Sequence, residues 1–291
     1  MAKLEYTFKN DTLFKSLFVR YPELLKHLVA DLLRIDIKSI EEFAISNPEI
    51  TPDVVGDKLC RLDISMTVNR QKVDIELQVR NKGDYPERTL YYWAREYSSA
   101  LGEGEKYIDL PQTIIISILY FKLFNCEEYF SEFQALEISR HTQLTDRFRL
   151  MYFELPKFSK TITKGDNIKA WLSLFKSETE EDLQEIESMG VSFMKETVEA
   201  YRQVTAADEF RNLERMRFDA SNIEASAIGY AEKKRDEHWQ GVIERMRFDA
   251  SNIEASAIGY AEKKRDEHWQ GVVAEKDATI AELKAQLKER E

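Results

Sequence analysis

The sequence contains few of the residues that build several common catalytic and structural sites. Only four histidines occur in 291 residues, and two of them, His238 and His268, are copies within a repeat. The sequence therefore offers few histidines for a zinc site or for histidine-based nucleolytic chemistry. Two cysteines, Cys60 and Cys126, do not make a disulfide framework, so we expect a reducing compartment. Any bound metal would take oxygen ligands, which suits magnesium or manganese.

Long apolar runs are also missing. No run reaches the roughly 18 to 20 residues that a membrane-spanning helix needs. The first residues, MAKLEYTFKND, lack the apolar centre of a signal peptide. We therefore expect a cytoplasmic protein with no membrane partner.

The charge distribution bears on nucleic acid as a partner. The net charge of −11 argues against DNA binding for the chain as a whole. Residues 1–160, however, carry 22 Lys+Arg against 25 Asp+Glu, whereas the remaining 131 residues carry 20 against 28. The front part is nearly neutral, which leaves room for a local basic groove.

The hydrophobic pattern predicts an α/β front part followed by helices. Three-to-four spacings predict helices within 11–33, with Asp11 as the expected N-cap and Pro22 in a first turn. The later elements expected are a strand within 39–50, a hairpin at 61–68 and 73–80, a helix over 86–101, a strand over 113–119 buried on both faces, and strands within 128–139 and 147–158. We expect this α/β domain to cover 1–160, a helical connector 161–213 and a helical tail 214–291.

The tail contains a tandem repeat. ERMRFDASNIEASAIGYAEKKRDEHWQGV occupies 214–242 and recurs unaltered at 244–272. On a straight helix, thirty residues turn the second copy by roughly 120° relative to the first. Apolar residues nevertheless recur at seven-residue spacings with a nine-residue skip, which favours a coiled coil with a local change of winding. A single solvated helix is the alternative interpretation.

The predicted hairpin gathers polar residues on one face. Alternate side chains of a strand share a face, so Asp63 lies on the same side as Asp74, Glu76 and Gln78. Carboxylates from the two arms could hold one magnesium ion, with manganese as a substitute and a backbone carbonyl as a third ligand. Asp74 is either a second-metal ligand or an exposed residue. An ordinary amphipathic hairpin with its charges in solvent is the competing interpretation.

A family resemblance favours the metal site. The pattern D63-x(12)-E76-L-Q78 looks like the metal motif of PD-(D/E)XK nucleases, with glutamine in the lysine position. NDTLFKSLF, RLDI, IELQV, RTLYYWAREYSSAL and GEKYIDLPQTIIISIL resemble, in that order, segments of the Rpn family of recombination-promoting nucleases, also called PD-(D/E)XK transposases. The likeness covers roughly residues 5–160. Pro52-Asp53 also spells the motif's first letters, but it lies 23 positions before Glu76 in an Asp/Gly-rich loop, whereas Asp63 is expected within a strand and with the right facing.

The resemblance implies a restriction-endonuclease-like core and magnesium-dependent cleavage of DNA, with links to recombination of mobile DNA and to phage defence. Carried over by position, Asp63 and Glu76 become the metal ligands and Gln78 the third catalytic residue. An amide cannot supply the positive charge of a lysine. Either the metal alone supplies it, or Arg80 or Arg88 substitutes. Asp11 could approach the site from the first helix.

Two further expectations concern function and partners. The missing lysine and the acidic tail favour, as the alternative, a catalytically silent interaction protein that uses the nuclease scaffold for binding. The helical tail predicts a homodimer or higher oligomer. The resemblance also suggests that the gene makes a short C-terminal product, starting for example at Met194 or Met216, that pairs with the full chain and regulates it.

Overall fold

The computed structural model describes residues 2–46, 49–50, 60–61, 63–159 and 166–288. The chain forms two compact units, Met1–Met216 and Arg217–Glu291. The expected strand at 39–50 and the first hairpin arm lie partly outside the described residues, as does Asp53.

The elements follow the predicted order in outline. The helices are α1 (Asp11–Arg20), α2 (Pro22–Leu33), α3 (Tyr85–Ser99), α4 (Asn167–Phe175), α5 (Glu180–Ser188), α6 (Ser192–Ala206) and α7 (Asp208–Lys288). The strands are β1 (Phe43–Ser46), β2 (Glu49–Ile50), β3 (Cys60–Arg61), β4 (Ile64–Val68), β5 (Gln71–Gln78), β6 (Thr113–Leu119), β7 (Phe130–Gln134) and β8 (Phe148–Glu154). A mixed α/β fold followed by a long C-terminal helix confirms the prediction at that level.

A six-stranded sheet forms the centre of the first unit, in the order β1-β4-β5-β6-β8-β7. Strands β5, β6 and β8 run parallel to one another, and the pairs β1–β4, β4–β5 and β7–β8 toward the two edges are antiparallel. Strand β6 is buried at every residue, as its β-branched run predicts, because β5 and β8 pair with its two sides.

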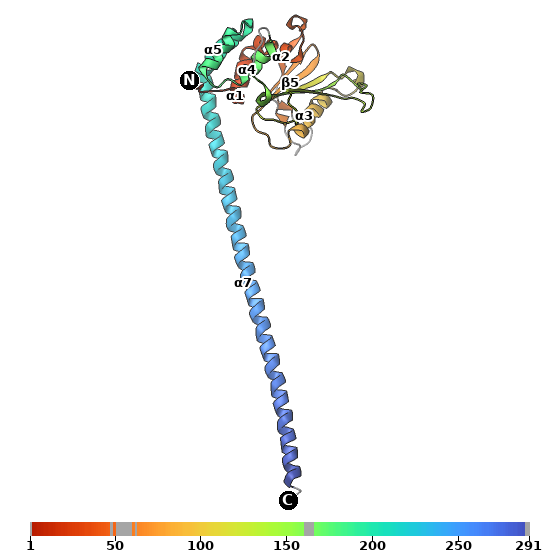
Figure 1. Cartoon of the computed structure of the whole chain (residues 1–291), viewed down its shortest axis with the longest axis vertical. Coiled ribbons are helices and arrows are strands. Elements are labelled where there is room, and N and C mark those ends of the chain that lie inside the picture. The colour runs from red at the N-terminus through yellow and green to blue at the C-terminus, as the bar shows by residue number, and fades with distance from the viewer. Residues whose placement is uncertain (1, 47–48, 51–59, 62, 160–165, 289–291) are drawn as a thin grey trace. The chain divides into compact units, whose positions relative to one another are not determined.

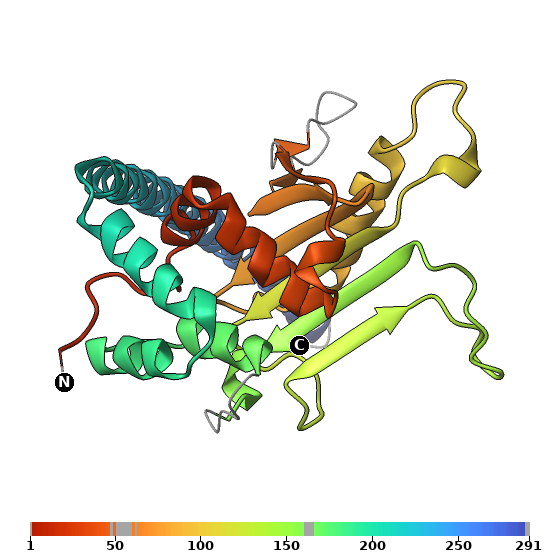
Figure 2. The same ribbon diagram turned by 90° about the horizontal axis from the view of Figure 1, so that it is seen from above.

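Helices cover both faces of this sheet, and the two faces bury different side chains. In Figure 1, α3 lies on the opposite side of β5 from α2 and α4, and Figure 2 shows the sheet and its covering helices from above. Ile75, Leu77 and alternate isoleucines of β6 pack with α1, α2 and α4 in the larger core. Ile115, Leu119, Leu150 and Tyr152 pack with Tyr85 of α3 in a smaller cluster. Alternation along β5 therefore places Asp74, Glu76 and Gln78 on the α3 face.

Helices α4 to α6 belong to the same core as the sheet. Trp171 is fully buried, stacks on Phe193 and donates from Nε1 to Asp31 Oδ2 at 2.8 Å. Phe210, at the start of α7, is also part of this core. The compact unit thus extends to Met216, beyond the boundary at 160 that the sequence pattern suggests.

Two local features differ from the prediction. The N-cap of α1 is Asn10, whose side chain accepts from the N–H of Leu13 at 3.1 Å, and Asp11 is the first helical residue. The expectation that Asp11 caps the helix is therefore wrong. The hairpin is also shorter than predicted. Asn69 and Arg70 form its turn in left-handed conformations, and β4 begins only at Ile64, so Asp63 occupies a bend before the strand.

Helix α7 carries both copies of the repeat in one uninterrupted helix of 81 residues (Figure 1). From Leu213 onward, large apolar side chains of this helix are exposed, including Met216, Ile223, Trp239, Ile253 and Trp269. Coiled-coil pairing stays a prediction. In the part of the chain that the structure describes, no helix combines the length and the apolar character that crossing a membrane requires.

Candidate functional site

The two hairpin carboxylates meet at one end of the sheet. Ile64 pairs with Ile75 in the antiparallel register, so Asp63 lies beside Glu76. The N–H of Asp63 donates to Glu76 Oε1 at 3.1 Å, and the N–H of Leu77 donates to Asp63 Oδ2 at 2.8 Å. The site also lies where ligands bind in many α/β proteins, because Glu76 is close to the carboxyl end of a parallel strand.

Burial makes this pair difficult to ionise. Glu76 is 2% exposed. Its burial, and then the neighbouring charge of Asp63, raise the pKa of Glu76 to about 8. Burial also raises the pKa of Asp63, although the Leu77 N–H and the Lys15 ammonium oppose this shift. Ionising both carboxyl groups at neutral pH therefore requires more positive charge than their surroundings provide.

Gln78 and Arg88 extend the site along the α3 face. Gln78 Nε2 donates to Glu76 Oε2 at 3.0 Å, and Arg88 Nη2 donates to Gln78 Oε1 at 2.6 Å. These two contacts fix the orientation of the amide between the Glu76 carboxyl group and the Arg88 guanidinium. The Arg88 guanidinium also lies 4.8 Å from the ring centroid of Tyr85. Arg80, the other candidate cation, is exposed and lies beyond the end of β5.

The loop between β5 and α3 positions Arg88. The side chain of Asn81 accepts from the N–H of Gly83 at 2.8 Å, and Gly83 has φ +87°, a conformation that glycine adopts without strain. Pro86 then stands in the first turn of α3, where its missing N–H costs no hydrogen bond. This tight reversal brings the start of α3 back over the end of β5.

Lys15 is a site residue that the sequence reasoning missed. Its Nζ lies 3.1 Å from Asp63 Oδ1. Asp11, one helical turn earlier, also influences Asp63, since its charge contributes to raising the pKa of that carboxyl. The i, i+4 spacing of Asp11 and Lys15 was visible in the sequence. No local signal could link α1 to the hairpin, because the fold alone makes that contact.

Asp74 does not lie in solvent, so the exposed alternative is wrong. Its side chain is fully buried. Burial, and then the charge of Glu96 on α3, raise its pKa well above the ordinary value, and the Ser65 hydroxyl moderates the shift. Asp74 also adds to the raised pKa of Glu76. The α3 face therefore carries a row of acidic groups.

The donor set of Asp63 and Glu76 suits a hard divalent cation. Among the residues that the structure describes, no three His, Cys, Asp or Glu side chains form a metal-binding group. Two carboxylates remain, and burial raises the pKa of both, with the charge of Asp63 adding to the shift of Glu76; a bound cation would relieve these shifts. Magnesium accepts so few protein ligands because it keeps several waters.

A comparison with protein families identifies the family of the chain. The family model of PD-(D/E)XK nuclease family transposases matches residues 8–231. The chain belongs to this family. The resemblance inferred from its motifs is thereby confirmed, and PD-(D/E)XK nucleases generally use divalent metals. No curated protein and no solved structure matches the chain.

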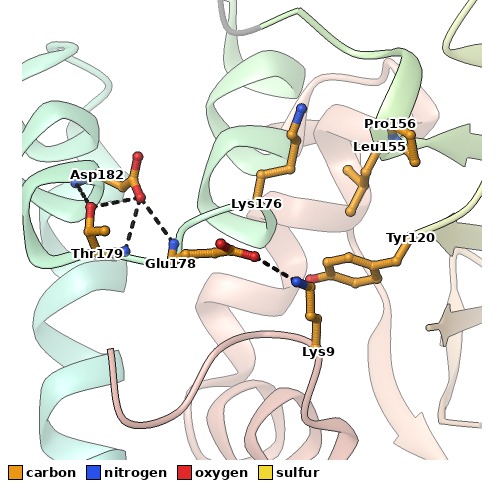
Figure 3. A pocket seen from close by; sticks show the side chains of 8 residues that line it. All are labelled: Lys9, Tyr120, Leu155, Pro156, Lys176, Glu178, Thr179 and Asp182. Atoms are coloured by element: carbon orange, nitrogen blue, oxygen red, sulfur yellow. Dashed lines mark hydrogen bonds and ion pairs between the residues drawn. The ribbon is translucent and has the colours of Figure 1, made fainter. Parts of the chain in front are cut away.

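A separate cavity in this PD-(D/E)XK family member lies away from the hairpin. It has a volume of about 540 Å³ and is lined by Lys9, Tyr120, Leu155, Pro156, Lys176, Glu178, Thr179 and Asp182 (Figure 3). Its polar groups largely satisfy one another: Lys9 pairs with Glu178 at 2.6 Å, and Thr179 and Asp182 form the capping box of α5. The cavity therefore lacks the uncompensated charge that distinguishes the hairpin site.

Proposed function

We propose that this PD-(D/E)XK family member is a divalent-cation-dependent DNA endonuclease. Asp63 and Glu76 are its cation ligands, Gln78 is the third catalytic residue, and Mg²⁺ is the natural ion, with Mn²⁺ as a substitute. The observation that carries the proposal is the buried Glu76 beside Asp63, with its pKa raised to about 8. Such a pair is costly to keep unless a cation binds between the two carboxylates.

The chain's own groups prepare this site. Lone pairs of Asp63 and Glu76 would hold the cation, which supplies Lewis-acid stabilisation of charge on the phosphate. Gln78 holds Glu76 Oε2 in place and is itself held by Arg88. Because Gln78 carries no charge, its part is to position groups. Arg80 and Lys82, exposed between β5 and α3, are suited to contact DNA phosphates next to the carboxylates.

Cleavage of supercoiled plasmid tests the proposal. The full chain should nick or linearise the plasmid with Mg²⁺ or Mn²⁺ and should be inactive with a chelator. Asp63→Asn removes one anionic ligand with little change in shape and should lower the rate at least a hundredfold. Asp109→Asn, at an exposed position, is the matched control. An unreduced rate for Asp63→Asn would show that the ligand assignment is wrong.

The silent-scaffold alternative makes a different prediction. It is favoured by the glutamine at position 78, which leaves the motif without its lysine. A scaffold of this kind would bind DNA without cutting it. Calorimetry with Mn²⁺ separates the cases further, since absence of binding would exclude the carboxylates as a metal site.

A nuclease of the proposed kind would act in the cytoplasm, in recombination of mobile DNA or in phage defence.

We also propose that α7 assembles the protein as a dimer or higher oligomer. If thirty residues complete eight turns, at about 3.75 residues per turn, both copies of the repeat place one apolar stripe on the same side. The stripe contains Met216, Ile223, Ile228, Trp239 and Ile243, repeated as Met246, Ile253, Ile258, Trp269 and Val273, each between 47% and 71% exposed. A winding looser than 3.6 residues per turn is typical of a right-handed supercoil.

Two double variants of the full chain test the pairing. Ile223→Glu with Ile253→Glu puts charge on the stripe and should shift the sedimentation coefficient to that of a monomer. Phe218→Glu with Phe248→Glu changes equally exposed residues off the stripe and should leave the assembly intact. Equal assembly of both variants would contradict the proposed stripe.

The same stripe would serve the proposed short product. A product that begins at Met216 contains both repeats except for the first two residues of the first copy, and it corresponds closely to the second compact unit. It could pair with α7 of the full chain and hold the nuclease inactive. Adding residues 216–291 to the plasmid assay tests this, because unchanged cleavage by the stable complex would reject inhibition.

A further inference from the structure

The site has a glutamine where the family motif carries a lysine, yet a lysine reaches it from another element. Lys15 Nζ, from α1, lies 3.1 Å from Asp63 Oδ1. We propose that Lys15 is a catalytic residue that contacts the scissile phosphate and supplies the positive charge that Gln78 lacks. This inference rests on the proposed nuclease function, which it deepens.

Helix α1 holds Lys15 firmly at the edge of the site. Leu13, Phe14, Leu17 and Phe18 bury one side of the helix in the main core. The Asn10 cap fixes its beginning. The side chain of Lys15 is 31% exposed and that of Asp63 is 13% exposed. The Lys15 side chain is therefore more open to solvent than the carboxylate with which it pairs, so a phosphate can reach it.

The other nearby cations have different surroundings. The Arg88 guanidinium hydrogen-bonds Gln78 and lies against the Tyr85 ring, so it acts through the amide. Arg80 is exposed beyond β5. Within the described part of the chain, Lys15 is the cation that forms an ion pair with one of the two proposed cation ligands, Asp63. A point charge on a flexible stem suits a phosphate whose charge grows during reaction.

The role of Lys15 in hydrolysis is electrostatic. The oxygen of a water bonds to phosphorus while the bond from phosphorus to the leaving sugar oxygen breaks. One water proton ends on the leaving oxygen, and the other is released as the phosphate monoester ionises. Lys15 keeps its own protons throughout and stabilises the phosphate oxygens by hydrogen bonding. When the Asp63 carboxylate holds the cation, the Lys15 ammonium would be able to leave this carboxylate and turn toward the phosphate.

A purely competitive role would look different. If Lys15 only neutralises Asp63 while the site has no cation, its removal should tighten cation binding and leave kcat at saturating Mg²⁺ unchanged. If Lys15 contacts the phosphate, its removal should lower kcat at saturating Mg²⁺ and DNA. The two roles are therefore separated by measuring kcat, KM and Mn²⁺ affinity on the same proteins.

The test uses four full-length variants. Lys15→Gln should lower kcat about a hundredfold at saturating Mg²⁺, and Lys15→Arg should retain part of the lost rate. Lys15→Gln combined with Gln78→Lys returns a lysine to the motif position and should recover at least about tenfold of the loss. Lys9→Gln removes a lysine that is ion-paired elsewhere, with Glu178, and should cleave like wild type.

The outcomes distinguish this inference from the nuclease proposal. Wild-type cleavage together with a Lys15→Gln kcat within about twofold of it would overturn the role of Lys15 alone. A tighter Mn²⁺ affinity at unchanged kcat would overturn it likewise. No cleavage by the wild-type chain would overturn both proposals. Recovery by Gln78→Lys supports the inference even if Lys15→Gln is less stable, since a loss caused by unfolding would not be restored by a relocated charge.

Discussion

Glu76→Gln should abolish divalent-cation binding at the hairpin and reduce cleavage on the order of a thousandfold. The substitution keeps the shape of the side chain and removes the charge that a hard cation requires. The amide oxygen of the variant can still accept from the N–H of Asp63, whereas its NH2 group would face the Nε2 donor of Gln78, so one of the two hydrogen bonds is lost. Calorimetry with Mn²⁺ measures the first effect and the plasmid assay the second.

The pH dependence gives a second signature of Glu76. Its pKa is about 8 without a cation, so below that pH a proton must leave before the carboxylate can bind one. The apparent Mn²⁺ affinity of the wild-type chain should therefore rise about tenfold per unit from pH 6 to 8 and then level off. Calorimetry across this range measures the slope. An affinity that is flat over these pH values would contradict the buried, protonated state.

The stability of the cation-free protein should change in the opposite direction. The pKa of Glu76 is raised on folding, so its stabilising contribution is complete below the unfolded value near 4.5 and is lost as pH rises through about 8. The side chain of the Glu76→Gln variant stays neutral at every pH, so the variant does not lose this contribution. Its free energy of unfolding at pH 7 should therefore be about 3 kcal/mol higher than that of wild type.

Glu154→Gln is the matched control for a buried carboxylate. Glu154 is 1% exposed and pairs with Lys157 at 2.6 Å, outside the site. Its substitution should lower the free energy of unfolding, because Lys157 loses its buried partner. Cation affinity should stay unchanged. Loss of Mn²⁺ binding in this variant would place the ion away from the hairpin.

Trp171→Ala should lower the free energy of unfolding of the first unit by about 3–5 kcal/mol. The indole is fully buried among Phe18, Phe175 and Phe193. The variant leaves a cavity and removes the hydrogen bond to Asp31. Urea unfolding measures the change. Trp171→Phe should cost less, because it keeps most of the packing and loses mainly the N–H donor.

Two tryptophans of the repeat are matched controls. Trp239 and Trp269 are 56% and 59% exposed, and neither belongs to the core of the first unit. Their substitution by alanine should leave the urea midpoint of that unit unchanged. If Trp171→Ala were as stable as these variants, α4 would not be part of the nuclease core. The 1–160 boundary suggested by the sequence pattern would then be the better description.

The local pattern determined the elements around the site. The β-branched run of β6 and the alternation along β5 were sufficient to predict buried strands, because side-chain periodicity depends only on backbone geometry. The spacing of Asp63, Glu76 and Gln78 was sufficient to infer a motif on one face. Pro86 likewise marked the start of α3. These features act within a few residues of each other or across one short turn.

Contacts between distant segments were beyond the reach of that pattern. Lys15 meets Asp63 only because the apolar side of α1 packs under the sheet. Arg88, and not Arg80, touches Gln78 because the loop after β5 folds α3 back over the strand. Trp171 joins the core through Asp31 of α2, far away in sequence.

The sequence by itself thus determined the family, the main secondary structure and the acidic residues of the hairpin. The tertiary structure decided which cations stand beside those residues, how deeply the carboxylates are buried and where the compact unit ends. The reason is physical. Periodicity and motif spacing are local properties of the chain, whereas desolvation and ion pairing depend on the groups that packing brings together.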